Sequence, residues 1–250
     1  MDTSNSFAGR HADYAFFLAH TDEPVRCRSV LLRALEGVPP GRVRWLDFGC
    51  GGGEFLEGVL RGWNRKADEV SLTLVDVDEA ARTGAVRRLA PWAGSVTAGE
   101  TVPGEGRFEV VTSNHALYYV ENLSETLDGL VRGLSEGGLG VWTLGGCGNQ
   151  LCRLWLAMFE EAGERLPFYL AEDVGRWLAA SDLEWREEPV GSVLRFPDTR
   201  INRARVARFL FGPRLERFGL ERVQEAFGAW QSGEEIVMES QDACFVVGGG

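Results

Sequence analysis

Apolar residues follow two spacings along this chain, and the alternation between them predicts strands separated by helices. Short apolar runs that are typical of buried strands lie at 43–48, 70–75, 108–113 and 140–144. Segments with helical spacing follow them in turn, at 54–63, 78–89, 123–134 and 150–162. This order predicts an α/β fold in which helices cover both faces of a mostly parallel sheet. The carboxyl ends of its strands then share one edge, where ligands bind.

The amino-terminal segment lies outside this alternation. Residues 12–37 have helical spacing, which Asp22 and Glu23 interrupt. Pro24 then fits the first turn of a second helix. We expect residues 1–40 to form a helical lid.

The end of the chain also changes character. A helix is predicted at 171–180, and two late strands are predicted at 183–194 and 235–247. The late strands fit an antiparallel hairpin that closes the sheet. Between them we expect a helical cap at 197–232, inserted into a domain of residues 41–250.

Charge and cysteine content narrow the class of protein. The chain has 250 residues with 37 acidic and 26 basic side chains, a net charge of −11. This balance argues against nucleic acid or an anionic membrane as the main partner. The five cysteines show no C-x-x-C spacing, so we expect neither a disulfide framework nor a metal site. With no long apolar stretch, we expect a cytoplasmic protein, monomeric or homodimeric.

A glycine-rich turn after the first strand is the most informative motif. It reads DFGCGGGE over residues 47–54, and Gly49 and Gly51 permit positive φ and close approach of a ligand. Nicotinamide enzymes use a similar turn to bind a diphosphate. Here Asp47 and Glu54 would repel a diphosphate and would suit S-adenosylmethionine, which carries an ammonium and a sulfonium. A nicotinamide site and a turn that only joins strand to helix are the alternatives.

Acidic residues after the next strands extend this candidate cofactor site. Asp76 ends the second strand region, where a carboxylate can accept both hydroxyls of a ribose. Val77 and Glu100 are further candidates for cofactor contacts. Asp78 fits the N-cap of the next helix instead.

A polar and aromatic loop follows the strand at 108–113. Asn114 is expected to contact the methionine part of the cofactor. His115 can move a proton near neutral pH. Tyr118 and Tyr119 offer aromatic faces to a cation, although buried tyrosines also serve as core.

These motifs together resemble the class I S-adenosylmethionine-dependent methyltransferases, a Rossmann-like fold. The chain is more specifically similar to the histamine N-methyltransferase-like group. The pieces that carry this similarity are FLAHTDE at 17–23, the glycine-rich turn, LYYV at 117–120 and Leu154-Trp155. The resemblance implies that Glu23 contacts the substrate amine, and that Tyr14, Tyr118, Tyr119, Trp155 and Gln241 line the substrate pocket.

The expected reaction is in-line attack of a small-molecule nucleophile on the sulfonium methyl. His115 would take up the departing proton, and Glu23 would stabilise the cation that forms. Because His115 stands where the animal enzyme has glutamine, a small amine other than histamine is expected, in bacterial natural-product metabolism. The alternatives are an O- or C-methyltransferase acting on an aromatic small molecule, and a relative that binds the cofactor without methylating.

Overall fold

The computed structural model describes residues 11–104 and 106–248. Its helices are α1 (His11–Ala19), α2 (Glu23–Leu35), α3 (Glu54–Gly62), α4 (Glu79–Leu89), α5 (Leu123–Gly133), α6 (Gln150–Glu161), α7 (Ala171–Ala179), α8 (Arg200–Phe211), α9 (Leu215–Phe218) and α10 (Leu220–Ala226). Its strands are β1 (Val43–Phe48), β2 (Val70–Val75), β3 (Ser95–Gly99), β4 (Phe108–Asn114), β5 (Leu134–Gly145), β6 (Trp185–Pro197), β7 (Gln231–Ser232) and β8 (Glu235–Gly248). No helix in this described part is both long and apolar enough to cross a membrane.

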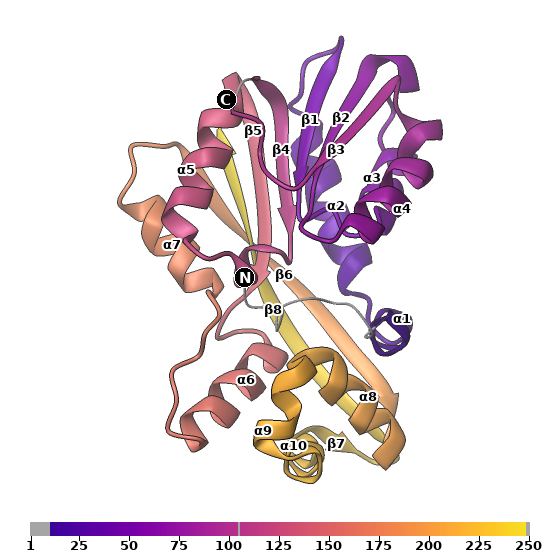
Figure 1. The fold of residues 1–250 in the computed structure, drawn as a ribbon, viewed down its shortest axis with the longest axis vertical. Coiled ribbons are helices and arrows are strands. Elements are labelled where there is room, and N and C mark those ends of the chain that lie inside the picture. Colours follow the sequence, from indigo (N-terminus) through magenta and orange to yellow (C-terminus); the bar gives the residue numbers. More distant parts are fainter. Residues whose placement is uncertain (1–10, 105, 249–250) are drawn as a thin grey trace. The chain divides into compact units, whose positions relative to one another are not determined.

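The strands form one sheet in the order β3-β2-β1-β4-β5-β8-β6, and β7 pairs with β8. Strands β3 to β5 are parallel neighbours, whereas the carboxyl-terminal strands run antiparallel. The chain crosses from β1 toward β3 in one direction and from β4 to β5 in the other. Right-handed crossovers therefore place α3 and α4 on one side and α5 on the other, as Figure 1 shows. The predicted fold class is confirmed.

The chain divides into two compact units. The sheet unit comprises Cys27–Leu144, Tyr169–Pro189 and Ala243–Gly250. The cap unit comprises Met1–Arg26, Gly145–Phe168 and Val190–Asp242. The predicted lid at 1–40 is thus distributed over both units, and its residues 1–10 lie outside the described part of the chain.

Helices of the sheet unit use their apolar stripes to cover the parallel strands. On α3 the buried side chains are Leu56, Val59 and Leu60, which share one face at helical spacing. Asp78 caps α4 by accepting hydrogen bonds from the N–H groups of Ala80 and Ala81 at 2.9 and 3.1 Å, as predicted. Helices α3 and α4 therefore begin within a few residues of the ends of β1 and β2, next to the candidate cofactor turn.

In the cap unit, α1 is held against α8. The carboxylate of Asp13 accepts two hydrogen bonds from Arg208 at 2.8 and 3.0 Å. Phe17 stacks on Phe209 with ring centroids 4.6 Å apart. The loop after α1 also pairs with β6, because Asp22 and Val193 exchange backbone and side-chain hydrogen bonds. The first helix and the helical insertion therefore form one packed body.

Besides the two-residue strand β7, which was not predicted, two strands differ from the prediction. Strand β3 was not predicted, because its Ser-Val-Thr-Ala-Gly sequence has no apolar run and most of its side chains are exposed. Strand β5 begins at Leu134 rather than at residue 140, and the pairing with β4 shifts register between Phe108 and Val110. Both differences arise at positions where pairing to a neighbour, rather than burial, defines the strand.

The turn after β1 depends on glycine at Gly49. Its φ is +72°, and a Cβ built there would lie 2.0 Å from the Cβ of Ala116. The turn and the loop after β4 are therefore in direct contact, with no room for a side chain. Gly51, at φ +51°, has open space where its Cβ would be, which leaves its backbone approachable.

We predict that Gly49→Ala destabilises the protein by about 3 kcal/mol, the sum of a left-handed backbone cost and overpacking. Gly84→Ala is the matched control, because Gly84 lies in α4 with no heavy atom within 4 Å of its Cβ position. The control should be neutral or slightly stabilising, since alanine favours a helix. Urea denaturation measures both values, and an equal effect of the two substitutions would contradict the proposed contact.

Candidate functional site

Backbone hydrogen bonds connect the loops at the carboxyl edge of the parallel strands. The N–H groups of Gly49 and Cys50 both donate to the carbonyl of Val75, at 2.7 and 3.0 Å. The N–H of Asp76, after β2, donates to the carbonyl of Gly99 in β3 at 3.2 Å. The N–H of His115, after β4, donates to the carbonyl of Thr143 in β5 at 2.8 Å. Each loop is therefore fixed for one residue beyond its strand.

This edge brings the predicted cofactor residues together within the sheet unit. The residues concerned are Asp47, Gly49, Gly51, Asp76, Val77, Glu100 and Asn114. Asp47 lies near the end of β1, Asp76 and Val77 follow β2, Glu100 follows β3, and Asn114 ends β4. Val77 is 78% exposed, so its side chain is accessible to a ligand.

Asp47 is buried and held by a chain of hydrogen bonds. The indole N–H of Trp45 donates to Oγ1 of Thr112 at 2.7 Å, and the Thr112 hydroxyl donates to the Asp47 carboxylate at 2.7 Å. The pKa of Asp47 is raised from its ordinary 3.8 to about 7, mainly by burial and also by the nearby charge of Asp76, against the opposing effect of the Thr112 hydrogen bond. Sequence analysis missed Thr112, since only the strand register reveals that it faces Asp47.

Asp76, the predicted ribose ligand, braces the glycine-rich turn. Its carboxylate accepts hydrogen bonds from the N–H groups of Gly51 and Asp78, each at 2.9 Å. Arg82 donates to its backbone carbonyl, a contact that was not predicted. Beside it, burial and the carboxylates of Asp47 and Asp76 raise the pKa of the Cys50 thiol, so this cysteine stays protonated.

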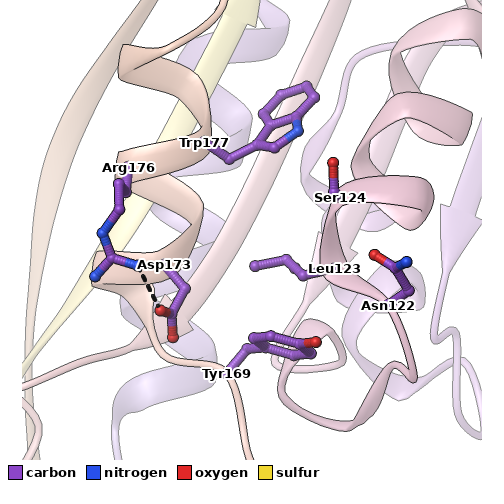
Figure 2. A pocket seen from close by; sticks show the side chains of 7 residues that line it. All are labelled: Asn122, Leu123, Ser124, Tyr169, Asp173, Arg176 and Trp177. Atoms are coloured by element: carbon purple, nitrogen blue, oxygen red, sulfur yellow. Dashed lines mark hydrogen bonds and ion pairs between the residues drawn. The ribbon is translucent and has the colours of Figure 1, made fainter.

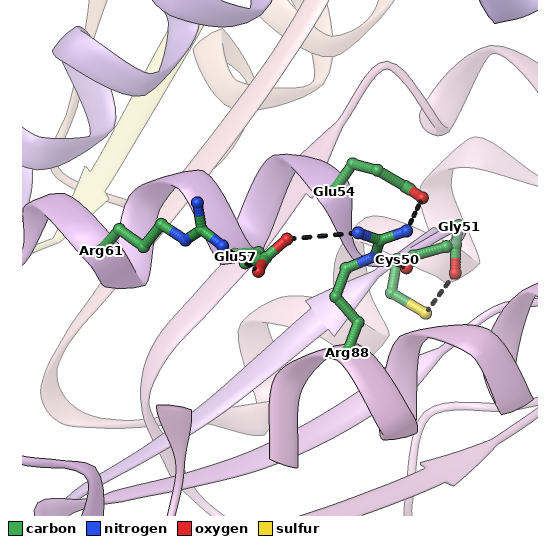
Figure 3. Close-up of polar contacts among 7 residues, drawn as sticks. Cys50, Gly51, Glu54, Glu57, Arg61 and Arg88 are labelled. Carbon is green, nitrogen blue, oxygen red and sulfur yellow. Dashed lines mark hydrogen bonds and ion pairs between the residues drawn. The ribbon is translucent and has the colours of Figure 1, made fainter. Parts of the chain in front are cut away.

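Glu54 does not present an uncompensated charge to the turn. Figure 3 shows Arg88 of α4 between Glu54 and Glu57 of α3, at 2.5 and 3.2 Å. Arg88 also donates to the carbonyl of Gly52 at 2.9 Å. Glu54 therefore repels a diphosphate much less than its position in the sequence predicts, because Arg88, remote in sequence, neutralises its charge. Asp47 and Asp76 carry the remaining negative charge.

Polar atoms at the end of β4 fit a cofactor. Among the described residues, Oδ1 of Asn114 and Oγ of Ser113 are buried without a hydrogen-bond partner. Such groups cost free energy unless something binds them. An unpartnered buried acceptor at Asn114 suits a ligand group that donates hydrogen bonds, such as an ammonium, so the residues present fit a nucleoside that carries an amino acid.

His115 follows directly and has a φ of +53°, unlike any other non-glycine residue in the described part of the chain. Its Nδ1 lies 2.9 Å from the hydroxyl oxygen of Tyr118. Tyr118 is buried, and its ring packs against that of Tyr119 with centroids 5.7 Å apart. The structure therefore joins three predicted substrate residues in one short loop of the sheet unit.

The other predicted substrate residues belong to the cap unit. Tyr14 is half exposed and packs on Phe209 of α8. Trp155 is buried, and its indole N–H donates to the carbonyl of Leu210 at 3.0 Å. Gln241 is exposed, and its backbone N–H donates to the carbonyl of Gly148.

Glu23 is buried at the first turn of α2, with 8% of its surface exposed. This excludes the simple alternative of a solvent-facing carboxylate at a helix start. Asp242, next to the predicted Gln241, is also buried, and it accepts a hydrogen bond from Asn149 at 2.7 Å. Within the cap unit, carboxylate oxygens of Glu23 and Asp242 lie within 4.8 Å of each other. Asp242 was not predicted, although a carboxylate directly before the apolar run 243–247 is a signal that could have indicated it.

A separate surface pocket of about 330 Å³ lies between α5 and α7 (Figure 2). Its lining residues are Asn122, Leu123, Ser124, Tyr169, Asp173, Arg176 and Trp177. None of them was predicted as a site residue.

A family model for the methyltransferase domain matches residues 18–188. The chain therefore belongs to the methyltransferase-domain family. This confirms the predicted enzyme class, a methyltransferase that depends on S-adenosylmethionine. No curated protein matches the sequence.

Solved structures show the same fold at low sequence identity. The YcgJ protein from Bacillus subtilis superimposes with a TM-score of 0.60 and 13% identity, covering 88% of this chain and 97% of that one. The plantazolicin methyltransferase BpumL in complex with SAH gives 0.56 and 11%, covering 98% and 92%. The 4+2 cyclase SpnF gives 0.53 and 18%, covering 88% and 80%.

The raised pKa of Asp47 predicts a pH-dependent stability. Its folded pKa of about 7 exceeds the ordinary 3.8, so the folded protein binds this proton more tightly than the unfolded chain. Protonated Asp47 therefore contributes fully to the free energy of unfolding at acid pH, and this contribution is lost as the pH rises from about 4 to 7. Asp47→Asn removes this loss, so the variant should gain stability relative to the parent between pH 5 and 8.

Urea denaturation of the cofactor-free proteins at several pH values measures this difference. Asp68→Asn is the control, because Asp68 is an exposed carboxylate of the same unit. A stability difference between Asp47→Asn and the parent that stays constant with pH would show that Asp47 is ionised throughout.

Two neighbouring aspartates follow β2, and we predict that replacing each by asparagine affects S-adenosylmethionine binding differently. Asp76→Asn should weaken S-adenosylmethionine binding about 10- to 100-fold, because a charge-assisted hydrogen bond is lost. Asp78→Asn should leave it within about twofold, since asparagine caps a helix as well as aspartate does. Calorimetric titration checks both, and equal losses would mean that Asp76 acts only by bracing the turn.

Proposed function

We propose that this enzyme transfers the methyl group of S-adenosylmethionine to the nitrogen of a small, cationic amine. The observation that carries this proposal is the pair of buried carboxylates, Glu23 and Asp242, within the cap unit. Two carboxylates this close repel each other unless a proton or a cation lies between them. A protonated amine is the small-molecule partner that such a pair favours.

The cofactor residues follow from the edge of the sheet unit. Asp76 is proposed to accept hydrogen bonds from the ribose hydroxyls, and Val77 and Glu100 to contact the adenine. Asp47 and Asn114 are proposed to bind the methionine ammonium. Gly49 and Gly51 let the backbone approach the ligand. When bound, S-adenosylmethionine supplies an electrophilic methyl group on a sulfonium.

An amine attacks that methyl group only when its nitrogen is neutral, although free alkyl amines are mostly protonated near pH 7. His115 is proposed to accept the departing proton, since an imidazole exchanges protons in this range. Glu23 is proposed to stabilise the positive charge that then forms on nitrogen. Within the sheet unit, Tyr118 and Tyr119 are proposed as aromatic contacts of the substrate. Within the cap unit, the resemblance assigns Tyr14, Trp155 and Gln241 to substrate binding, and this role is proposed for them here.

The proposal retains the resemblance to the histamine N-methyltransferase-like group as the finer assignment. It is supported by the burial of Glu23, which the resemblance assigns to the substrate amine. We also propose that α1, packed on α8 through Asp13 and Arg208, acts as part of a lid with the helical insertion.

A panel of methyl acceptors tests the proposal. The purified enzyme with S-adenosylmethionine should methylate at least one primary or secondary amine, and mass spectrometry should place the added methyl on nitrogen. Phenols and carbon nucleophiles of similar size should not react. Glu23→Gln should raise the KM for the amine about tenfold or more, because a charge-assisted hydrogen bond is lost.

The reverse preference, for phenols over every amine, would replace this proposal by an O-methyltransferase. A cofactor that stays intact with every ligand that binds would favour a relative that does not methylate. Asp68→Asn, at an exposed position of the sheet unit, is the control for Glu23→Gln and should leave the KM unchanged.

A further inference from the structure

Within the cap unit, the loop that precedes α6 is fastened to β8 next to the buried carboxylate of Asp242. This loop comprises residues 146–149. The backbone N–H of Gln241 donates to the carbonyl of Gly148 at 3.0 Å. A Cβ built at Gly148 would lie 2.9 Å from the carbonyl oxygen of Gln241, so only glycine lets the two segments lie this close. The loop and the strand therefore form one rigid support for the side chains that follow.

Asn149 ends this loop and caps α6. Its Oδ1 accepts hydrogen bonds from the backbone N–H groups of Leu151 and Cys152, at 2.9 and 3.2 Å. Backbone N–H groups can only donate, so the atom of this amide that faces the helix must be its oxygen. The two ends of an asparagine amide are often ambiguous, but here the cap determines which end is the nitrogen.

The nitrogen of the same amide holds Asp242. Nδ2 of Asn149 donates to Oδ1 of Asp242 at 2.7 Å, and both residues are buried. An amide NH₂ group donates and does not accept, so the direction of this hydrogen bond is also determined. A carboxylate accepts several hydrogen bonds, so this contact fixes the Asp242 side chain without excluding a ligand.

The neighbourhood of Glu23 shows why such a restraint matters. Carboxylate oxygens of Glu23 and Asp242 lie within 4.8 Å of each other, and two carboxylates at this distance repel. The hydrogen bond from Asn149 opposes this repulsion and keeps Asp242 in place. It does so without adding a positive charge, whereas in the sheet unit Arg88 neutralises Glu54. The restraint from Asn149 therefore preserves the attraction of the pair for a cation.

We propose that Asn149 is a positioning residue for the amine substrate, which holds Asp242 beside Glu23 in the orientation that binds the ammonium group. This inference rests on the proposed function, in which the pair of carboxylates binds a cationic amine. A side chain that becomes ordered only when its ligand arrives weakens the affinity, and one that is already ordered does not. Asn149 therefore acts on the affinity for the amine and not on the methyl transfer itself.

Asn149→Ser tests this role, because serine caps a helix about as well as asparagine and removes the amide donor. The probe is the primary or secondary amine that the parent enzyme methylates best. Its KM should rise about tenfold, the effect of one lost charge-assisted hydrogen bond. The value of kcat and the KM for S-adenosylmethionine should stay within about twofold, the pattern of an interaction that contributes only to substrate binding.

Asn122→Ser is the matched control, since it makes the same change at another helix cap. Asn122 caps α5 of the sheet unit by accepting a hydrogen bond from the N–H of Glu125 at 3.2 Å. This variant should leave the KM for the amine unchanged.

A double-mutant cycle with Asp242→Ala shows whether Asn149 acts through Asp242. In the Asp242→Ala protein, Asn149→Ser should change the affinity for the amine by less than about twofold, because the carboxylate that it positions is gone. Calorimetric titration in the presence of S-adenosylhomocysteine measures this affinity without turnover. Urea denaturation gives a second cycle that needs no ligand. There, Asn149→Ser should lower the equilibrium constant for folding about tenfold in the parent, and much less in the Asp242→Ala protein.

Two outcomes would overturn the inference. One is a folded Asn149→Ser protein whose KM for the amine equals that of the parent. The other is a denaturation cycle in which Asn149→Ser has the same effect with and without the Asp242 carboxylate. A failure of the proposed function is seen separately, as a parent enzyme that methylates no amine, and the denaturation cycle then still decides whether Asn149 holds Asp242.

Discussion

The candidate site depends on the double hydrogen bond from Gly49 and Cys50 to the carbonyl of Val75. It joins the end of β1 to the end of β2, and only a turn with left-handed glycines can make it. Asp76 secures the same turn from the other strand by accepting the Gly51 N–H. The loop of His115 also depends on this turn, because Ala116 packs directly against Gly49.

The sequence predicted those strands and helices whose buried side chains recur with a regular spacing along the chain. Strands β1, β2 and β4 and their helices have apolar spacings that leave few alternatives. The edge strand β3 was missed because pairing with β2 defines it. One junction between the two units lies within α2, where nothing in the spacing of a continuous helix marks it.

The sequence predicted which residue types lie at the candidate site, but not the contacts that they make with residues remote in sequence. Asp76 and Asn114 lie at the expected edge because a strand precedes each of them. The neutralisation of Glu54 by Arg88 was hidden, since the two are far apart in sequence and meet only when α3 packs on α4. The support of Asp47 by Trp45 and Thr112 was hidden in the same way, in the register of β1 and β4.

These hidden contacts change the electrostatic argument for the cofactor without reversing it. With Glu54 compensated, discrimination against a diphosphate falls to Asp47 and Asp76, and Asp47 is buried with a raised pKa. A cationic ligand nearby favours the ionised form of such a carboxyl, whereas an anionic ligand opposes it. In the proposed cofactor site, selectivity would then come from a carboxyl whose charge the ligand itself helps to establish, rather than from a fixed negative surface.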